Sequence, residues 1–135
     1  MFTNVHLHNI HKLLTLAYIT HEGPMDRLKT QLKKFVSERE WDQFHNPKNL
    51  VLSLVSETGE LAEIFRWLSH EECERIMNNP KIAQHIQEEV ADIFSNLLLL
   101  AMKLNIDLEH CSLQKLIMNE EKYPTKIWKG RVKQV

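Results

Sequence analysis

Apolar residues recur every three or four positions in four separate stretches of the chain. This is the spacing of a helix that buries one face, whereas no stretch shows the alternation with a period of two that a half-buried strand requires. The four stretches cover about residues 24–38, 47–68, 82–104 and 108–122. The pattern therefore predicts an all-α protein, and a four-helix bundle is its natural architecture.

Residues that start helices stand at the beginning of three of these stretches. Pro24 and Pro47 open the first two, and proline is favoured in the first helical turn because the amide hydrogen that it lacks has no partner there. Asn46 and Asp107 carry side chains that cap helix N-termini. Between the second and third stretches, residues 70–83 are polar, which predicts a connector that can include a short helical turn.

We expect one domain over residues 23–135, because a chain of this length can bury one core but is cramped for two. The domain ends in a basic tail from Thr125 to Val135. Residues 1–22 are expected to form a helical or partly ordered extension. We interpret its histidines as polar positions of an amphipathic arm, because no acidic or cysteine partner that would suit a metal site stands beside them. These histidines are His6, His8 and His11.

The charge and cysteine content disfavour nucleic-acid and membrane partners and an oxidising compartment. The 17 basic and 18 acidic residues leave the chain nearly neutral, which gives no reason to expect a nucleic-acid or membrane surface. No apolar run approaches the roughly 20 residues of a membrane span. Cys73 and Cys111 are too few for a disulfide framework and fit a reducing compartment, so we expect a cytoplasmic protein.

The second predicted helix contains three glutamates that look alike in the string SETGELAE but occupy different faces. On a helical wheel at about 100° per residue, with Glu57 at zero, the apolar residues fall between about 340° and 140°. They are Leu50, Leu54, Leu61, Ala62, Ile64, Phe65 and Leu68. Glu57 lies inside this arc and Glu60 at its edge near about 300°, whereas Glu63 falls on the polar side near about 240°.

The third predicted helix repeats this arrangement. Its apolar residues occupy about 20° to 200° when Glu89 is set at zero. Glu89 borders this arc and Glu88 points further outward, while Asp92 and Asn96 share the other flank. Each long helix thus places two carboxylates, three residues apart, along the rim of its buried face.

The four carboxylates converge if the two helices pack antiparallel. Residues three apart on a helix have Cβ atoms about 5–6 Å apart, and Mg²⁺ prefers oxygen ligands such as carboxylates. A magnesium site is one interpretation, and the other is that these acids merely edge two amphipathic helices. A di-iron carboxylate bundle is disfavoured, because it needs Glu-x-x-His pairs and no glutamate of the two helices has a histidine three residues on.

Two further sets of residues have two interpretations each. Trp41 and Trp67 flank the acidic helix, and they can stack on a nucleotide base or pack in a core or interface. Lys115, Asn119 and Lys122 stand at roughly helical spacing, and they can face phosphates or solvent.

Four ordered sequence blocks resemble the MazG-like all-α pyrophosphohydrolases, closest to their dCTP pyrophosphatase branch. The blocks run from Glu38 to Leu50 (ERxWxxFHxPxNL), from Glu57 to Trp67 (ExxELAExFxW), from Glu88 to Ile93 (EExADI) and from Lys115 to Pro124 (KxxxNxxKYP). The resemblance covers about residues 32–131. It implies packed helices that assemble as a dimer or a dimer of dimers. It also implies an enzyme that uses Mg²⁺ to cut a nucleoside triphosphate to its monophosphate and pyrophosphate.

The resemblance also implies roles for individual residues. The metal-binding and catalytic carboxylates are then Glu57, Glu60, Glu89 and Asp92, the four that the helical wheels select. The residues that line the base pocket are then Trp41, His45 and Trp67. Those that hold the triphosphate or close the site are then Lys115, Asn119, Lys122 and Tyr123.

Two positions depart from the dCTP branch and bear on the preferred base. Leu32 stands where that branch can carry a histidine, and Asn96, near the base or sugar, where it can carry a tyrosine. A pyrimidine deoxynucleotide, dCTP or a modified form of it, is the first expectation. Related helical enzymes that act on dUTP or phosphoribosyl-ATP are an alternative. A catalytically idle helical oligomer that binds nucleotide or a protein partner is another, although the complete set of four acids argues against it.

Overall fold

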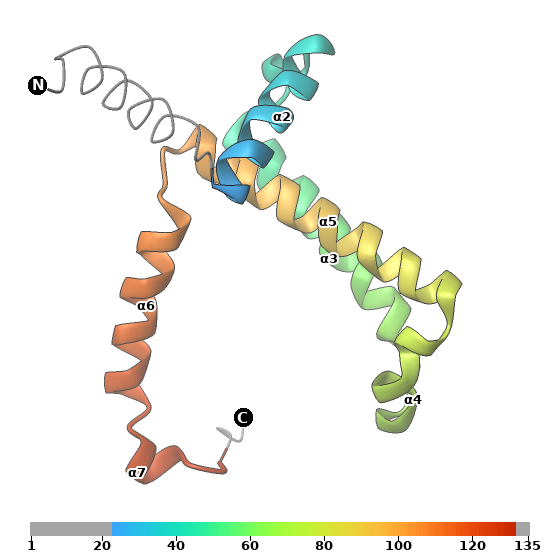
Figure 1. Ribbon diagram of the computed structural model, residues 1–135, viewed down its shortest axis with the longest axis vertical. Helices are drawn as coiled ribbons and strands as arrows, with labels where there is room; N and C mark the ends of the chain where they lie inside the picture. The colour runs from blue at the N-terminus through green and yellow to red at the C-terminus, as the bar shows by residue number, and fades with distance from the viewer. Residues whose placement is uncertain (1–22, 132–135) are drawn as a thin grey trace, which may run out of the picture. The chain divides into compact units, whose positions relative to one another are not determined.

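The computed structural model describes residues 23–131, and every regular element in that range is a helix (Figure 1). The all-α class predicted from the sequence is therefore confirmed. The chain divides into two compact units at the boundary between His45 and Asn46. The extension predicted over residues 1–22 and its histidines lie outside the described residues.

The first unit contains helix α2 (Pro24–Glu38) and the 3₁₀ turn η1 (Trp41–Gln43). The bounds predicted for the first helix are thus confirmed, with proline in its first turn. Glu40 connects the two elements with a left-handed backbone, at φ 54°. The ring of Phe35 packs edge-to-face against that of Trp41, with 5.7 Å between their centroids.

The second unit contains the remaining helices. They are α3 (Pro47–Phe65), α4 (His70–Arg75), the 3₁₀ turn η2 (Ile76–Asn78), α5 (Pro80–Lys103), α6 (Leu108–Lys122) and α7 (Thr125–Trp128). Asn46 caps α3 by accepting a hydrogen bond from the backbone N–H of Asn49. Asp107 caps α6 in the same way, through the N–H of His110. Both predicted caps are therefore confirmed.

Several element boundaries differ from the predicted ones. Helix α3 ends at Phe65 instead of continuing to Leu68. The polar connector contains the six-residue helix α4, which a capping box stabilises, because Ser69 and Glu72 each accept a hydrogen bond from the other's backbone N–H. Helix α5 begins at Pro80, two residues earlier than predicted, because Asn79 accepts hydrogen bonds from the first free backbone amides. The basic tail begins with the short helix α7.

The extensive packing in the second unit is between α3 and α5, which lie side by side and run in opposite directions (Figure 1). Leu50 near the start of α3 and Leu98 near the end of α5 are almost fully buried, as is Ala101. Ala83 and Ile86, in the first half of α5, are buried as well. The buried stripe of α5 thus runs along most of its length, and the candidate carboxylates lie between its two ends.

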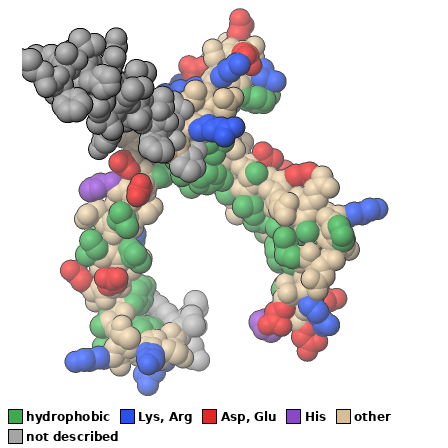
Figure 2. Space-filling view, viewed as in Figure 1, with side chains coloured by type: hydrophobic (Ala, Val, Ile, Leu, Met, Phe, Trp, Pro, Cys, Tyr) green, Lys and Arg blue, Asp and Glu red, His purple; other side chains and the backbone are tan. Residues whose placement is uncertain are grey.

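Helix α6 contributes no buried residue to the described part of the chain. Its apolar side chains Leu113, Leu116 and Ile117 are each more than half exposed, and Figure 2 shows apolar side chains along this helix. Val51, Leu52 and Val55 leave α3 with a second exposed apolar surface. None of the helices within residues 23–131 combines the length and apolar character that a membrane span requires.

Candidate active site

Three carboxylates from the two packed helices meet beside the core. Glu57 and Glu60 of α3 and Glu89 of α5 each have an oxygen within 4.8 Å of the oxygens of the other two. Residues 57 and 60 are one helical turn apart on α3, and the antiparallel packing brings Glu89 to the same place. The convergence predicted from the two helical wheels is therefore present for these three residues.

Glu89 is the one buried charged residue among residues 23–131, at 7% exposure. Its Oε1 lies 3.0 Å from Nε2 of His85, one turn earlier on α5. Its Oε2 is buried and has no hydrogen-bond partner. A buried carboxylate oxygen without a partner is costly, and a cation bound at that oxygen would remove the cost.

Glu57 shows the electrostatic consequence of this crowding. Desolvation by its surroundings raises the pKa of the Glu57 carboxyl, and the negative charges of Glu60, Asp92 and Glu89 raise it further. Asp92 is exposed and lies outside the closest group of three oxygens, but its charge acts on the same spot. Four carboxylates that repel one another, one with an unpaired buried oxygen, form an all-oxygen donor set that fits Mg²⁺.

The two look-alike glutamates of these helices have other partners. Glu63 places its carboxylate oxygens 2.9 and 3.1 Å from Nη1 of Arg66, on the exposed face of α3. Glu88 accepts a hydrogen bond of 2.8 Å from the side-chain amide of Gln84, on the exposed face of α5. The outward orientation predicted for both residues is therefore confirmed, and neither belongs to the cluster.

Two candidate nucleotide-binding residues, Trp67 and Asn96, lie on or next to the helices that carry the carboxylates. Trp67, two residues beyond the end of α3, is 83% exposed, and the guanidinium of Arg66 lies 5.4 Å from the centroid of its ring. An indole this exposed offers a free aromatic face. Asn96 is half-buried on α5, one turn after Asp92.

Trp41 and His45 belong to the first unit and lie next to one another there. Their ring centroids are 6.4 Å apart, with the rings tilted at 59°. Trp41 is 43% exposed, whereas Nδ1 of His45 is buried without a hydrogen-bond partner. The structure thus pairs these two predicted base-pocket residues with each other.

The residues predicted to hold the triphosphate lie together on the last part of α6 and at its C-terminus. Lys115 and Lys122 are exposed and Asn119 is half-buried. Tyr123 stacks edge-to-face on Trp128 at 5.4 Å, with Nζ of Lys122 5.3 Å from its ring centroid. Within the described residues α6 has no extensive contact with α3 or α5, so the structure groups these four residues with one another and not with the carboxylates.

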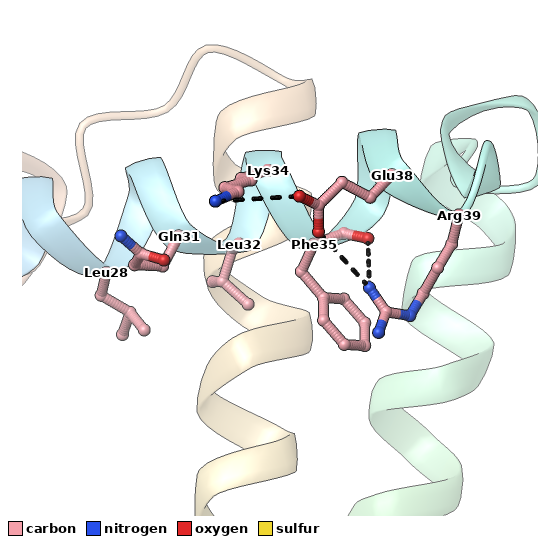
Figure 3. A pocket seen from close by; sticks show the side chains of 7 residues that line it. All are labelled: Leu28, Gln31, Leu32, Lys34, Phe35, Glu38 and Arg39. Atoms are coloured by element: carbon pink, nitrogen blue, oxygen red, sulfur yellow. Dashed lines mark hydrogen bonds and ion pairs between the residues drawn. The ribbon is translucent and has the colours of Figure 1, made fainter.

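An open depression of about 380 Å³ lies along α2 in the first unit (Figure 3). Its walls are Leu28, Gln31, Leu32, Lys34, Phe35, Glu38 and Arg39. The ammonium of Lys34 pairs with Glu38 at 3.8 Å, and Arg39 donates to the backbone oxygen of Phe35. A single helix and its C-terminal cap supply every wall of this surface groove.

The sequence reasoning missed His85. The spacing H-x-x-x-E that it forms with Glu89 was visible, because residues four apart on a helix face each other. The Glu-x-x-His pattern places a histidine three residues after a glutamate, whereas His85 stands four residues before Glu89.

Comparison with known proteins places these residues in a family. Residues 52–134 match the MazG-like family. The chain is 37% identical over 109 residues to dCTP pyrophosphatase 1 of Rattus norvegicus, a match that covers 81% of this chain and 64% of the relative. It is 37% identical over 103 residues to dCTP pyrophosphatase 1 of Homo sapiens, covering 76% of this chain and 61% of the relative. The matched part thus spans less than two thirds of the length of these relatives.

The fold is similar to that of a solved pyrophosphatase from Archaeoglobus fulgidus, with a TM-score of 0.72 and 34% sequence identity. That match covers 77% of this chain and 95% of the archaeal chain. The match to the MazG-like family includes the segment that carries all four candidate carboxylates, residues 57–92. This chain belongs to the MazG-like family.

Proposed function

We propose that this protein is a magnesium-dependent nucleoside triphosphate pyrophosphohydrolase that releases a nucleoside monophosphate and pyrophosphate. One observation carries the proposal: oxygens of Glu57, Glu60 and Glu89 converge within 4.8 Å, and Glu89 has a buried oxygen with no protein partner. The names of the relatives, dCTP pyrophosphatase 1 and a pyrophosphatase, support the same reaction.

Glu57, Glu60, Glu89 and Asp92 are the residues that would hold Mg²⁺. Bound there, the ion supplies charge neutralisation for the phosphates and lowers the pKa of water near the reacting phosphorus. Water attacks the α-phosphorus, the bond from that phosphorus to the bridging oxygen breaks, and pyrophosphate leaves. One carboxylate of this cluster accepts the proton of the attacking water.

We propose dCTP, or a modified pyrimidine deoxynucleotide, as the substrate. The two relatives named dCTP pyrophosphatase 1 support this choice. The exposed indole of Trp67 provides a stacking surface for the base. The remaining residues assigned to the base and sugar are Trp41, His45 and Asn96. Those assigned to the triphosphate, or to closing the site over it, are Lys115, Asn119, Lys122 and Tyr123.

We also propose that the chain works as a homo-oligomer, either a dimer or a dimer of dimers. The exposed apolar side chains of α6 and of the outer surface of α3 support this assembly. Contiguous apolar surface of this kind marks protein–protein contact sites in soluble proteins. Light scattering on the purified protein measures the assembly directly, and a monomer at micromolar concentration contradicts it.

The experiment that tests the reaction is pyrophosphate release from a panel of canonical and modified NTPs and dNTPs, with Mg²⁺ and with EDTA. We expect metal-dependent release of pyrophosphate together with a monophosphate, fastest with a pyrimidine deoxynucleotide. The best substrate shows how Leu32 and Asn96 set the base preference. Absence of product across the panel, from folded protein with Mg²⁺ present, contradicts the proposal and favours an idle oligomer that only binds nucleotide.

A further inference from the structure

His85 and Glu89 form a close pair along one face of α5. Nε2 of His85 lies 3.0 Å from Oε1 of Glu89, whose side chain is 10% exposed, while the imidazole itself is 56% exposed. The pair thus joins a solvent-facing donor to a buried carboxylate. His85 is not among the residues that the sequence predicts for this site.

The contact gives the two carboxylate oxygens of Glu89 different surroundings. Oε1 lies 3.0 Å from Nε2 of His85, within reach of a hydrogen bond from an Nε2–H, and Oε2 is buried without any partner. A carboxylate with one oxygen held cannot rotate without breaking that hydrogen bond. The hydrogen bond therefore selects Oε2 as the oxygen that remains for a ligand. Groups that hydrogen-bond to a metal ligand orient it and commonly change metal affinity by about 10–100-fold.

We propose that His85 is a positioning residue for the metal site: its hydrogen bond to Oε1 holds the Glu89 carboxylate so that Oε2 is presented to Mg²⁺. This inference rests on the proposed function, since it takes Glu89 as a metal ligand. It adds a specific residue outside the four carboxylates to the binding of the ion. His85 does not touch the substrate in this scheme and acts only through Glu89.

The same helix contains a matched pair one residue earlier. Gln84 donates from Nε2 to Oε1 of Glu88 over 2.8 Å, with the same four-residue spacing, on the exposed face. This pair shows that a glutamine at the first position reaches a glutamate carboxylate four residues later. His85→Gln is therefore the variant that keeps a donor, and Gln84→Ala is the control that breaks an equivalent hydrogen bond away from the cluster.

The test is to titrate the metal-free protein of residues 1–135 with Mn²⁺ alone. Electron paramagnetic resonance measures how much of the ion remains free. We expect His85→Ala to bind Mn²⁺ about 10-fold more weakly than wild type. His85→Gln is expected to recover most of the affinity, and Gln84→Ala to bind like wild type. In pyrophosphate release, His85→Ala is expected to need more Mg²⁺ for half-maximal rate, while its rate at saturating Mg²⁺ stays near that of wild type.

Two outcomes overturn the positioning role: His85→Ala binding Mn²⁺ as tightly as wild type, or His85→Gln binding as weakly as His85→Ala. Glu89→Gln separates this failure from failure of the proposed function. If Glu89→Gln loses Mn²⁺ while His85→Ala keeps full affinity, only the role of His85 is overturned. If Glu89→Gln binds like wild type, the metal site and the inference both fall. Should His85→Ala not fold, His85→Leu, which also lacks a donor, takes its place.

Discussion

Glu57 on α3 and Glu89 on α5 bring carboxylate oxygens within 4.8 Å of each other, although they are 32 positions apart in the sequence and lie on helices that run in opposite directions. Two negative charges this close to a buried stripe raise the free energy of the folded chain. The core could have been completed with apolar residues at both positions. Their presence is therefore better explained by a cation than by packing.

The first prediction concerns the two carboxylates at the rim of the cluster. Glu60→Gln and Asp92→Asn each replace one proposed charged ligand with a neutral amide while keeping the side-chain shape. We expect each to lower the rate of pyrophosphate release by at least about 100-fold, because charge stabilisation by a bound metal ion contributes several kcal/mol to the transition state. The measurement is pyrophosphate release at saturating substrate over a range of Mg²⁺ concentrations.

Matched controls for these variants stand on the same helices. Glu63→Gln and Glu88→Gln make the same chemical change at positions whose carboxylates already pair with Arg66 and Gln84 on the exposed faces. We expect both controls to keep activity close to wild type, since surface pairs of this kind contribute little to stability. A loss as large as that of Glu60→Gln would show that the rates report total charge and not the cluster.

The second prediction uses the raised pKa of Glu57. A carboxyl whose pKa is raised by folding stabilises the folded chain below its ordinary pKa, and this contribution is lost as the pH rises through the raised value. In metal-free protein, Glu57→Gln is therefore expected to raise the melting temperature above that of wild type at neutral pH, because ionised Glu57 is disfavoured by desolvation and by its acidic neighbours. The difference is expected to shrink as the pH falls.

Thermal unfolding in EDTA from acidic to neutral pH measures this difference, and the same series with Mg²⁺ provides the control. Mg²⁺ is expected to stabilise wild type more than Glu57→Gln, since binding to the folded state alone raises its stability. A melting-temperature difference that is the same at every pH would mean that the substitution acts through packing instead of charge.

The parts of the fold that were predicted correctly depend on local chemistry. The Asn46-Pro47 and Asp107 signals act within one helical turn, so the sequence alone fixes where α3 and α6 begin. The capping box of Ser69 and Glu72 is equally local, and its S-x-x-E spacing predicts helix α4. The prediction of a connector over residues 70–83 with a short helical turn rested on polarity, and the structure confirms the turn as helix α4. Polarity alone does not give the bounds of such a short exposed helix.

The candidate site was predictable to the extent that helical periodicity fixes it. The wheels separate Glu57 and Glu60 from Glu63 because burial follows rotation about the helix axis. Helical periodicity does not predict how deeply each side chain is buried. Glu89 is buried while Asp92, one turn later, is exposed, because burial at a given height depends on which side chains of α3 lie opposite.

The third prediction tests whether Trp67 binds the nucleotide base. Because its side chain is 83% exposed, Trp67→Ala is expected to leave the melting temperature of the protein nearly unchanged. Loss of base stacking, about 1–3 kcal/mol, is expected to raise KM by roughly 5–150-fold. Trp67→Phe keeps an aromatic face, and its KM is expected to lie between those of the wild type and Trp67→Ala. An unchanged KM in Trp67→Ala, measured with the best substrate of the panel, removes Trp67 from the base site.

The fourth prediction contrasts a buried leucine with an exposed isoleucine. Leu98 is 1% exposed in the α3–α5 core, so Leu98→Ala is expected to lower the free energy of unfolding by about 2–5 kcal/mol.

Ile117 on α6 is 51% exposed, and in an isolated chain Ile117→Asp would change stability little. If a second copy covers this surface, the buried charge is costly. We then expect Ile117→Asp to shift the protein to a smaller species in size-exclusion chromatography with light scattering.

The control for Ile117→Asp is Ser112→Asp, which adds the same charge at another exposed position of α6. We expect it to keep the wild-type assembly, because Ser112 lies about 140° around the helix from Ile117. If both variants dissociate, α6 responds to charge in general and the contact surface is not assigned. If neither does and the wild type is oligomeric, the copies meet elsewhere, and the exposed valines of α3 are the next surface to test, through Val55→Asp. The concentration dependence of the melting temperature distinguishes these cases, since only an assembly held together by the substituted surface loses that dependence.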